Sequence, residues 1–296
     1  MTEQRILAAI LREDLSSFIH KTFHTVAPAR CYLHNWHIDA IAWHLSLCAR
    51  GEINRLIITV PPRYLKSICA TIAFPAWVLG HDPTQRSITA SYADALAVNH
   101  ARLFRMVVVN PWYQRIFPRT RIDAKKNTET EVTFTRGGYR LATTVGGTLT
   151  GRGGDIVIVD DPIKAQDALS KPLRRRVVEW FDTTLLSRLD DKEKGVIIVI
   201  MRRLHPDDLG VELLDLRLMI PDGSLGAVRE CRAKTVHCLT FPRAQLVRMH
   251  IVPGRDLMDR PVAPKRRQRN TGLEIRRKPA PLRHIVSLRY PVEYIA

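Results

Sequence analysis

Apolar residues recur along the first two thirds of the chain at two different spacings. Spacings of three and four residues predict amphipathic helices over residues 3–23, 38–49, 67–79, 93–109 and 171–189. Short, nearly continuous runs rich in β-branched residues predict buried strands at 55–60, 86–91, 155–160 and 195–201. Two further runs, 131–135 and 139–144, predict a hairpin across Arg136-Gly137-Gly138. We expect Gly80 to cap the C-terminus of the helix before it.

This alternation of strands and helices predicts an α/β fold, with a mostly parallel sheet covered by helices on both faces. The domain plan that follows has a helical N-terminal segment, 1–54, and an α/β core, 55–213. Because sheets of this kind bind ligands beyond the carboxyl ends of their strands, candidate chemistry is expected there.

Charge changes the reading of the last third of the chain. The net charge of the 296 residues is +17, which indicates a polyanionic partner. Residues 214–296 carry 17 Lys and Arg against 7 Asp and Glu and show no sustained period, so we expect a basic, poorly ordered tail. No apolar run is long enough for a membrane span, and the N-terminus does not resemble a signal peptide. The five cysteines form no CxxC pair, and a reduced, cytoplasmic protein is expected.

The first strand runs directly into a helix through Pro61-Pro62-Arg63-Tyr64-Leu65-Lys66-Ser67. A nucleoside triphosphate at such a turn needs a helix N-terminus, a Lys on the β and γ oxygens, and a Ser or Thr hydroxyl on Mg²⁺. Lys66 and Ser67 suit those last two roles. Both glycines of the usual phosphate loop are absent, with Val60 and Leu65 in their places. The alternative is a plain helix start with Ser67 as its cap.

A second candidate follows the strand at 155–160, which ends in two acids. Asp160 suits a carboxylate that holds Mg²⁺ through its water shell, and Asp161 suits one that orients or deprotonates the attacking water. In the alternative, Asp161-Pro162 opens a turn that Asp160 caps. The acids and the Lys-Ser turn support each other, because both follow strands of the same predicted sheet.

Three further features lie near this predicted site. A glycine-rich segment, 145–154, carries Arg152, which is expected to stabilise γ-phosphate charge in cis or in trans; the alternative is a flexible surface loop with Arg152 solvated or touching DNA. The segment 201–209 follows the last predicted strand and is expected to couple the nucleotide to motion, with Asp207 capping a short helix. An aromatic and histidine patch around residues 32–44 reads as core packing, with Tyr32 as a candidate for adenine stacking, and metal binding is not expected there.

Several motifs, in order along residues 15–213, resemble the ATPase half of phage terminase large subunits. They are Pro61-Pro-Arg-Tyr-Leu-Lys-Ser67, Trp77-Val-Leu-Gly80, Gly137-Gly138-Tyr139, Gly146-Gly-Thr-Leu-Thr-Gly-Arg-Gly153, Val159-Asp-Asp-Pro162 and Arg203-Leu-His-Pro-Asp-Asp-Leu209. The resemblance implies a P-loop NTPase-like fold and a motor that uses ATP and Mg²⁺ to move double-stranded DNA into a capsid. It implies a homo-oligomer in the bacterial host, with the terminase small subunit and the capsid portal as partners and no membrane.

Carried onto this chain, the resemblance implies that Lys66 and Ser67 hold phosphate and Mg²⁺ and that Arg63 faces the phosphates. Asp160 becomes the acid on the metal side, and Asp161 takes a catalytic position that the family more usually fills with Glu. Arg202 is a second departure, because a small or amide side chain is expected there.

The resemblance ends after Leu213, where the family continues into a nuclease domain. Residues 214–296 offer seven scattered acids and no strand that would gather them around two metal ions, so nuclease activity is not expected. A frameshift is our hypothesis for this change. Two alternatives to an active motor remain: an inactive remnant that binds DNA by charge, and a different P-loop enzyme such as a helicase or a small-molecule kinase.

Overall fold

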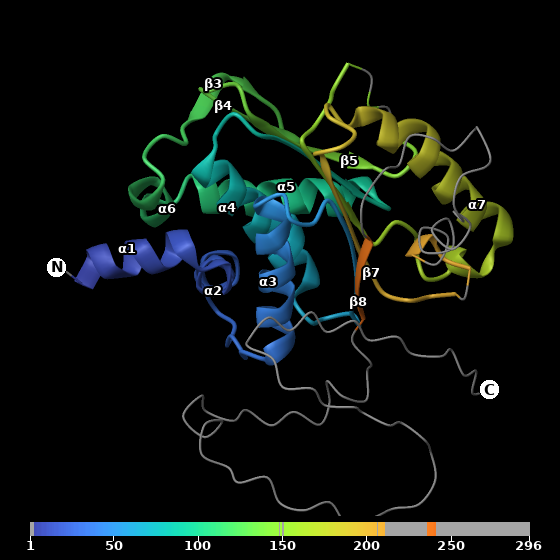
Figure 1. Cartoon of the computed structure of the whole chain (residues 1–296), viewed down its shortest axis with the longest axis horizontal. Helices are drawn as coiled ribbons and strands as arrows, with labels where there is room; N and C mark the ends of the chain where they lie inside the picture. Colours follow the sequence, from blue (N-terminus) through green and yellow to red (C-terminus); the bar gives the residue numbers. More distant parts are fainter. Residues whose placement is uncertain (1–2, 148, 150, 206, 211–235, 241–296) are drawn as a thin grey trace, which may run out of the picture. The chain divides into compact units, whose positions relative to one another are not determined.

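The predicted strands join into a single mixed sheet. The computed structural model describes residues 3–147, 149, 151–205, 207–210 and the backbone of 236–240. The strands are β1 (Arg55–Thr59), β2 (Arg86–Ser91), β3 (Ile122–Asn127), β4 (Glu131–Phe134), β5 (Tyr139–Thr144), β6 (Ile156–Asp160), β7 (Val196–Met201) and β8 (Val236–Thr240). They lie in the order β3-β4-β5-β2-β6-β7-β1-β8. Figure 1 shows β3 and β4 toward one end of the sheet and β7 and β8 toward the other. The strands from β5 to β8 pair in parallel, and β4 and β3 are added antiparallel.

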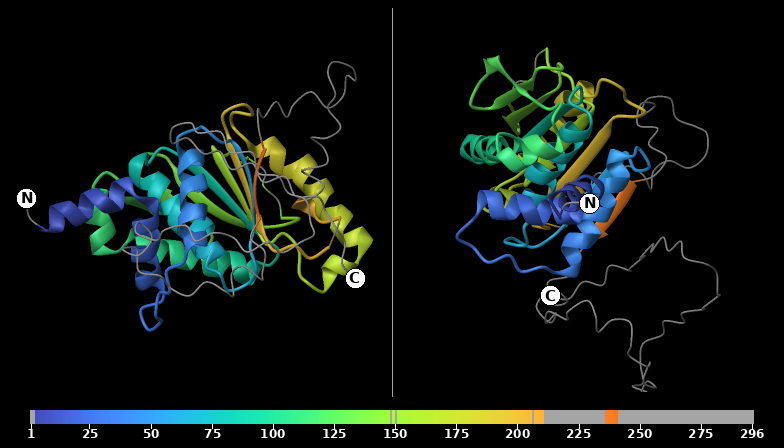
Figure 2. Two further views of the ribbon diagram at one scale, coloured as in Figure 1. Left: turned by 60° about the horizontal axis from the view of Figure 1, so that its bottom comes forward. Right: turned by 90° about the vertical axis from the view of Figure 1, so that its left-hand side faces the viewer.

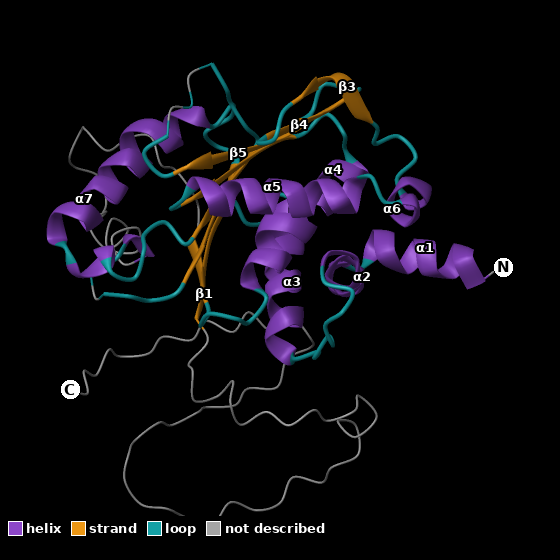
Figure 3. Ribbon diagram, turned by 180° about the vertical axis from the view of Figure 1, so that it is seen from behind, coloured by secondary structure: helices purple, strands orange, loops and turns teal. Residues whose placement is uncertain are grey.

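Helices cover both faces of the sheet, as the alternating elements predict. On one face lie α2 (Leu15–Val26), α3 (Trp36–Ala49), α4 (Phe74–His81), α5 (Asp94–Val108) and α6 (Pro111–Ile116), preceded by α1 (Glu3–Glu13). On the other lies α7 (Lys171–Trp180) with its continuation, and Figures 2 and 3 show the sheet between the two layers. The fold class is therefore α/β with a mostly parallel, doubly covered sheet. No helix among the described residues is long and apolar enough to cross a membrane.

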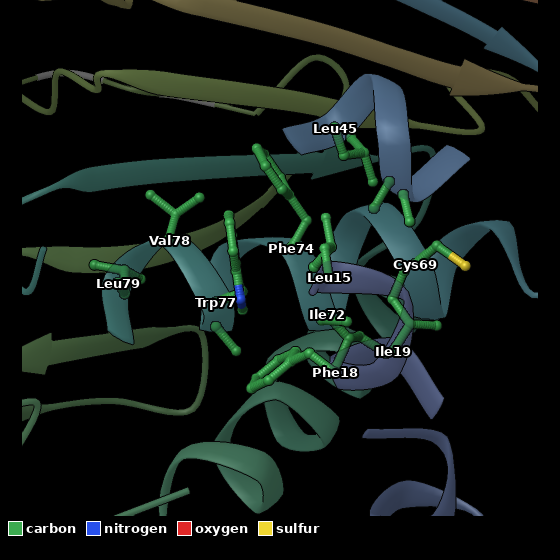
Figure 4. Packing of buried hydrophobic residues seen from close by; sticks show 14 of the residues in the cluster. Leu15, Phe18, Ile19, Leu45, Cys69, Ile72, Phe74, Trp77, Val78 and Leu79 are labelled. Carbon is green, nitrogen blue, oxygen red and sulfur yellow. The ribbon is translucent and has the colours of Figure 1, made fainter. Parts of the chain in front are cut away.

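Alternate residues of the central strands build two separate apolar cores. Ile156 and Ile158 of β6 face the larger cluster, while Val157 and Val159 face the smaller cluster under α7. The larger core packs side chains of α2, α3 and α4 together, including Phe18, Phe74 and Trp77 (Figure 4). A strand that is buried on both sides has no polar positions, which explains the continuous apolar runs that mark β6 and β7 in the sequence.

The expected helix over 3–23 is two helices. Asp14 stands between α1 and α2 with extended backbone, and its carboxylate accepts the amides of Ser16 and Ser17 at 3.3 and 2.8 Å. This is an N-cap, which ends the helical period locally and starts a new helix. The apolar spacing alone does not reveal the break.

The expected cap at Gly80 is wrong, because this glycine lies inside α4, which ends at His81. Gly80 is needed for a close approach: a Cβ there would lie 2.5 Å from Cδ2 of Phe117. The helix that contains it also differs from the expectation in its first part, where Ile68–Ala73 forms a π-helix, η1.

The remaining differences lie where the sequence pattern is weak. The helix expected over 171–189 is α-helical only to Trp180 and continues as a π-helix (η3, Phe181–Leu185) and a 3₁₀ turn (η4, Leu186–Arg188), and another 3₁₀ turn, η2, spans Asp167–Leu169. The short α6 and the polar β3 are not predicted. The hairpin is confirmed as β4 and β5.

Beyond the boundary predicted at Leu213, the described residues form one further strand of the sheet. β8 pairs in parallel with β1 at the sheet edge, although no strand is predicted in this part of the sequence. The rest of the predicted basic tail, 214–235 and 241–296, lies outside the described residues. The expectation that it holds no nuclease domain concerns the same residues and stays a prediction.

Candidate functional site

The turn after β1 brings Lys66 and Ser67 to the start of a helix. The Leu65 carbonyl accepts the Cys69 amide at 2.9 Å, which makes it the first acceptor of the helix that begins at Lys66. The amides of the first turn of a helix have no acceptor within the helix and carry partial positive charge. Lys66 and Ser67 are therefore placed as a phosphate-binding helix start requires.

The turn reaches this geometry without the glycines of the usual phosphate loop. Arg63 and Leu65 instead adopt left-handed backbone conformations, with φ of 71° and 59°. A left-handed residue with a side chain costs about 1–3 kcal/mol, and such strain concentrates at functional sites. Leu65 packs against the larger core, which offsets part of this cost, whereas Arg63 is exposed at the turn.

Asp161 closes the other side of the site. Its carboxylate forms an ion pair with the Lys66 ammonium, and its backbone is also left-handed, with φ of 47°. The Arg202 amide is a second hydrogen-bond donor to this carboxylate. Burial raises the pKa of Asp161, and Lys66 opposes that rise. The predicted pairing of the Lys-Ser turn with the acids at the end of β6 is thus present in the fold.

Asp160 is fully buried beside this ion pair. Its Oδ2 accepts a hydrogen bond of 2.9 Å from the Thr71 hydroxyl, and its Oδ1 has no hydrogen-bond partner among the described residues. Burial raises the pKa of Asp160, while the Lys66 charge and the Ser67 and Thr71 hydroxyls favour its charged form. A buried carboxylate oxygen without a partner fits the acid of a Mg²⁺ site.

Sequence reasoning missed a polar cluster behind Asp160. The Nδ1 of His100, on α5, lies 3.9 Å from Oδ2 of Asp160. Burial, aided by the charge of nearby Arg140, lowers the pKa of His100 to about 4, so the imidazole is neutral at pH 7. Arg140, on β5, is fully buried, and burial lowers its pKa to about 9. Only Arg140 carried a signal in the sequence: a lone Arg at an inward-facing position of a strand.

The segment after β7 also reaches the site, as expected for 201–209. β7 lies between β1 and β6, and backbone bonds from Val60 to Met201 and from Asp161 to Ile200, 3.0 and 2.9 Å long, tie the three strand ends together. Further on, Asp208 accepts the Leu204 amide and forms an ion pair with Arg203 at 3.2 Å, while the cap expected at Asp207 stays a prediction. The described part of the helix that was expected to follow is Leu209 and Gly210.

Tyr32 lies in an aromatic cluster against α2. Its ring centroid is 4.4 Å from that of His20 and 5.1 Å from that of Phe23, and its hydroxyl is buried without a partner among the described residues. Burial raises the pKa of Tyr32. Tyr32 is partly buried against the larger core. The expected core packing of the whole patch is wrong, because Trp43 and His34 are exposed. Adenine stacking by Tyr32 stays a prediction.

His37 has a closer link to the loop than the sequence suggests. Its ring is buried, lies 5.4 Å from the ring of Tyr64, and its Nε2 is 3.3 Å from the Tyr64 carbonyl. His37 therefore contacts the backbone and the ring of Tyr64 in the strained turn, in addition to packing in the core.

Arg152 is directed away from the Lys66–Asp161 pair. It forms an ion pair of 2.8 Å with Glu131 and lies over the ring of Tyr139, 5.4 Å from its centroid. Tyr139 begins β5, whereas the site lies at the carboxyl ends of the parallel strands. In this conformation Arg152 takes no part in the site of its own chain, so a role in trans stays a prediction. Gly153 serves close packing within the chain, since a Cβ there would meet the carboxylate of Asp190, whereas Gly146 and Gly151 adopt positive φ with open space around them.

A cavity of about 400 Å³ adjoins the helix start. It is mainly apolar, with two polar side chains, and is lined by Val26, Ala27, Pro28, Ala29, Arg30, Ile68, Asn99 and Leu103. A second, more polar groove of about 220 Å³ follows the ends of β2, β5 and β6. The first of these two has a volume within the usual range of small-ligand pockets, and the second is smaller.

Comparison with known proteins adds little beyond the fold. No protein-family model matches this chain, and no curated protein matches its sequence. Among solved structures, the chain is similar to the crystal structure of the HK97 bacteriophage large terminase, at 15% sequence identity and a TM-score of 0.45. The similarity covers 81% of this chain and 43% of that one, so this chain spans less than half of that protein.

Proposed function

We propose that this chain is an ATPase of the phosphate-loop type that requires Mg²⁺ and acts on double-stranded DNA as a packaging motor. The observation that carries the proposal is the contact between Lys66, at a helix start after one strand, and Asp161, beside the fully buried Asp160 at the end of another. A cation, two acids, a hydroxyl and helix amides then converge within one small site.

The residues present fit a bound Mg²⁺–nucleotide. The Ser67 hydroxyl and the Asp160 carboxylate would hold the cation, and Oδ1 of Asp160 is free among the described residues to serve it. Bound Mg²⁺ supplies charge that stabilises the transferring phosphoryl group. Lys66 and the helix amides would bind phosphate oxygens, and Arg63 is exposed at the turn where it can add a second cation.

Asp161 is the candidate for orienting the attacking water and accepting its proton. Its raised pKa makes it a better base than an exposed carboxylate, and Lys66 holds it at the site. Phosphate binding by Lys66 would compete with this ion pair and release the carboxylate toward water. Through Lys66, phosphate binding would therefore make the Asp161 carboxylate available to accept a proton from water.

Double-stranded DNA is the proposed partner because the chain is strongly basic. The net charge is +17, and α7 presents a run of basic residues on the outer layer. Arg152 supports assembly into a homo-oligomer only if it acts on a neighbouring copy. A terminase small subunit and a capsid portal are further proposed partners, which rest on the resemblance in the sequence motifs.

The decisive experiment is hydrolysis of ATP by the full chain with Mg²⁺, with and without double-stranded DNA, beside Lys66→Ala. A motor predicts turnover that needs Lys66 and increases with DNA. An inactive remnant predicts no turnover, with DNA binding that weakens with salt at a slope of about −0.9 per neutralised phosphate and is the same in Lys66→Ala. A small-molecule kinase predicts Lys66-dependent consumption of ATP that needs an added acceptor and ignores DNA.

A further inference from the structure

Thr71 connects the helix after the loop to the acid at the end of β6. It is fully buried, and its hydroxyl donates to Oδ2 of Asp160 at 2.9 Å. A carboxylate held by one oxygen can no longer rotate freely, and its second oxygen keeps a defined direction. That second oxygen, Oδ1, is the one without a partner among the described residues.

The contact between Thr71 and Asp160 is made from an irregular part of the helix. Thr71 lies in the π-helix η1, where the Phe74 amide bonds the Cys69 carbonyl five residues back. An extra residue in a helical turn rotates the side chains that follow it, and π-helical turns are frequent at functional sites. The irregularity falls immediately after Ser67, on the face of the helix that meets β6.

Arg140 supports the same residue from the other side. Its Nη2 lies 3.5 Å from the Thr71 carbonyl, and its guanidinium is 5.3 Å from the ring centroid of Phe104. A fully buried guanidinium is costly, and its Nε and Nη1 have no partner among the described residues. Burying such polar groups in an otherwise apolar layer is unfavourable, so we expect them to have a role in holding the neighbouring site in place.

We propose that Thr71 is a positioning residue that fixes the Asp160 carboxylate for a divalent cation, with Arg140 holding Thr71 from behind. This inference rests on the proposed function and deepens it, because it names the residues that set the affinity of the site for its cation. Both side chains are fully buried, so neither is exposed to a nucleotide bound at the surface of the site. Their effect is therefore expected on the cation and not on the nucleotide alone.

The test measures two affinities on the full chain: Mn²⁺ in the presence of a non-hydrolysable ATP analogue, by electron paramagnetic resonance, and the analogue alone in EDTA. Thr71→Val removes the hydroxyl and keeps the shape of the side chain, while Thr71→Ser keeps the hydroxyl. Loss of an outer-shell partner typically weakens metal affinity about 10–100-fold. We expect a weakening in that range for Thr71→Val, with affinity for the analogue in EDTA changed less than about twofold and Thr71→Ser close to the unmodified chain. Arg140→Met is expected to change Mn²⁺ affinity in the same direction as Thr71→Val.

Each other outcome overturns the inference. Unchanged Mn²⁺ affinity in Thr71→Val removes the positioning role. An equal loss in Thr71→Val and Thr71→Ser, or a matching loss of the analogue in EDTA, assigns Thr71 to helix packing. If Thr71→Val does not fold, as judged by its melting curve, Thr71→Ala takes its place. If the unmodified chain binds no analogue, the proposed function fails and this inference fails with it, whereas binding that is indifferent to Thr71 defeats the inference alone.

Discussion

Lys66 and Asp161 form an ion pair across the sheet edge, although 95 residues separate them in the chain. Lys66 follows β1 and Asp161 follows β6, and Arg202, directly after the strand between them, β7, donates its amide to the same carboxylate. The Lys66 side chain is almost fully buried, with 7% exposed. Removing either partner would therefore leave the other buried without its ion pair.

Lys66→Ala is expected to destabilise the chain by about 2–4 kcal/mol at pH 8, because it leaves two buried carboxylates without their cation. Burial raises the pKa of Asp160 and of Asp161, so their protonated forms favour the fold and their contribution is lost as pH rises. The loss should therefore be smaller at pH 5. Urea unfolding at both pH values measures it, with Lys125→Ala as a control for an exposed Lys. A loss that does not grow between pH 5 and 8 would contradict the buried pair.

Arg63→Gly is expected to stabilise the fold by about 1 kcal/mol and to weaken nucleotide binding. Glycine adopts the φ of 71° without strain, while the guanidinium proposed to face the phosphates is lost. Arg63→Ala separates the two effects, since it removes the guanidinium and keeps the strain. Thermal unfolding and binding of a fluorescent ATP analogue measure both quantities. Equal stability of the Gly and Ala variants would rule out strain at this position.

Continuous apolar strands and the residues at their ends could be read from the sequence. Ile156–Val159 and its two acids, and the Lys-Ser turn after β1, each follow a strand buried on both faces. Parallel strands place their carboxyl ends at one edge, so the meeting of these motifs follows from the fold class.

Other parts of the site could not be predicted because they depend on contacts between distant segments. The π-helical register that turns Thr71 toward Asp160 has no period of its own in the sequence. The burial of His100 and Arg140 is set by how α5 crosses β5 and β2, and a helical pattern does not specify that crossing. Arg152 is a further example. The sequence predicts the hairpin that carries Glu131, but it does not predict that Arg152 forms an ion pair with that hairpin.

His100→Gln is expected to make the fold less sensitive to acid. In the folded chain the pKa of His100 falls to about 4 from 6.5, so the stability that depends on its neutral form is present above pH 6.5 and is lost as pH falls toward 4. The groups that face it are Arg140, Lys66, Asp160 and Asp161. Between those pH values the free energy of unfolding of the variant should fall less than that of the unmodified chain, by up to about 3 kcal/mol. Unfolding by urea at several pH values measures the curve, and His24→Gln is the control for an exposed histidine. An unchanged slope would mean that His100 does not titrate with folding.

Tyr32→Phe is expected to leave stability unchanged or to raise it by up to about 1 kcal/mol, because the hydroxyl is buried without a partner among the described residues. Its affinity for nucleotide should not change, since the ring remains. Tyr32→Ala then distinguishes stacking from packing. If the ring stacks on adenine, this variant weakens binding of an ATP analogue at least about tenfold. Phe23→Leu, which disturbs the same cluster and keeps Tyr32, is the control, and an equal loss there would assign Tyr32 to packing.

Arg152 is expected to act on a neighbouring copy if it acts in hydrolysis at all, because its own chain holds it against Glu131 and Tyr139. Arg152→Ala and Lys66→Ala should each be inactive alone. In a mixture, a site with intact Lys66 can receive Arg152 from the other variant, so part of the turnover should return. An arginine supplied in this way is worth about 10³–10⁵ in rate, so even a few restored sites are measurable. Glu131→Gln, which frees Arg152, should keep full activity and serves as the control. Full activity of Arg152→Ala alone would show that the ion pair with Glu131 is structural. If the mixture hydrolyses no ATP, the catalytic Arg is a residue other than Arg152.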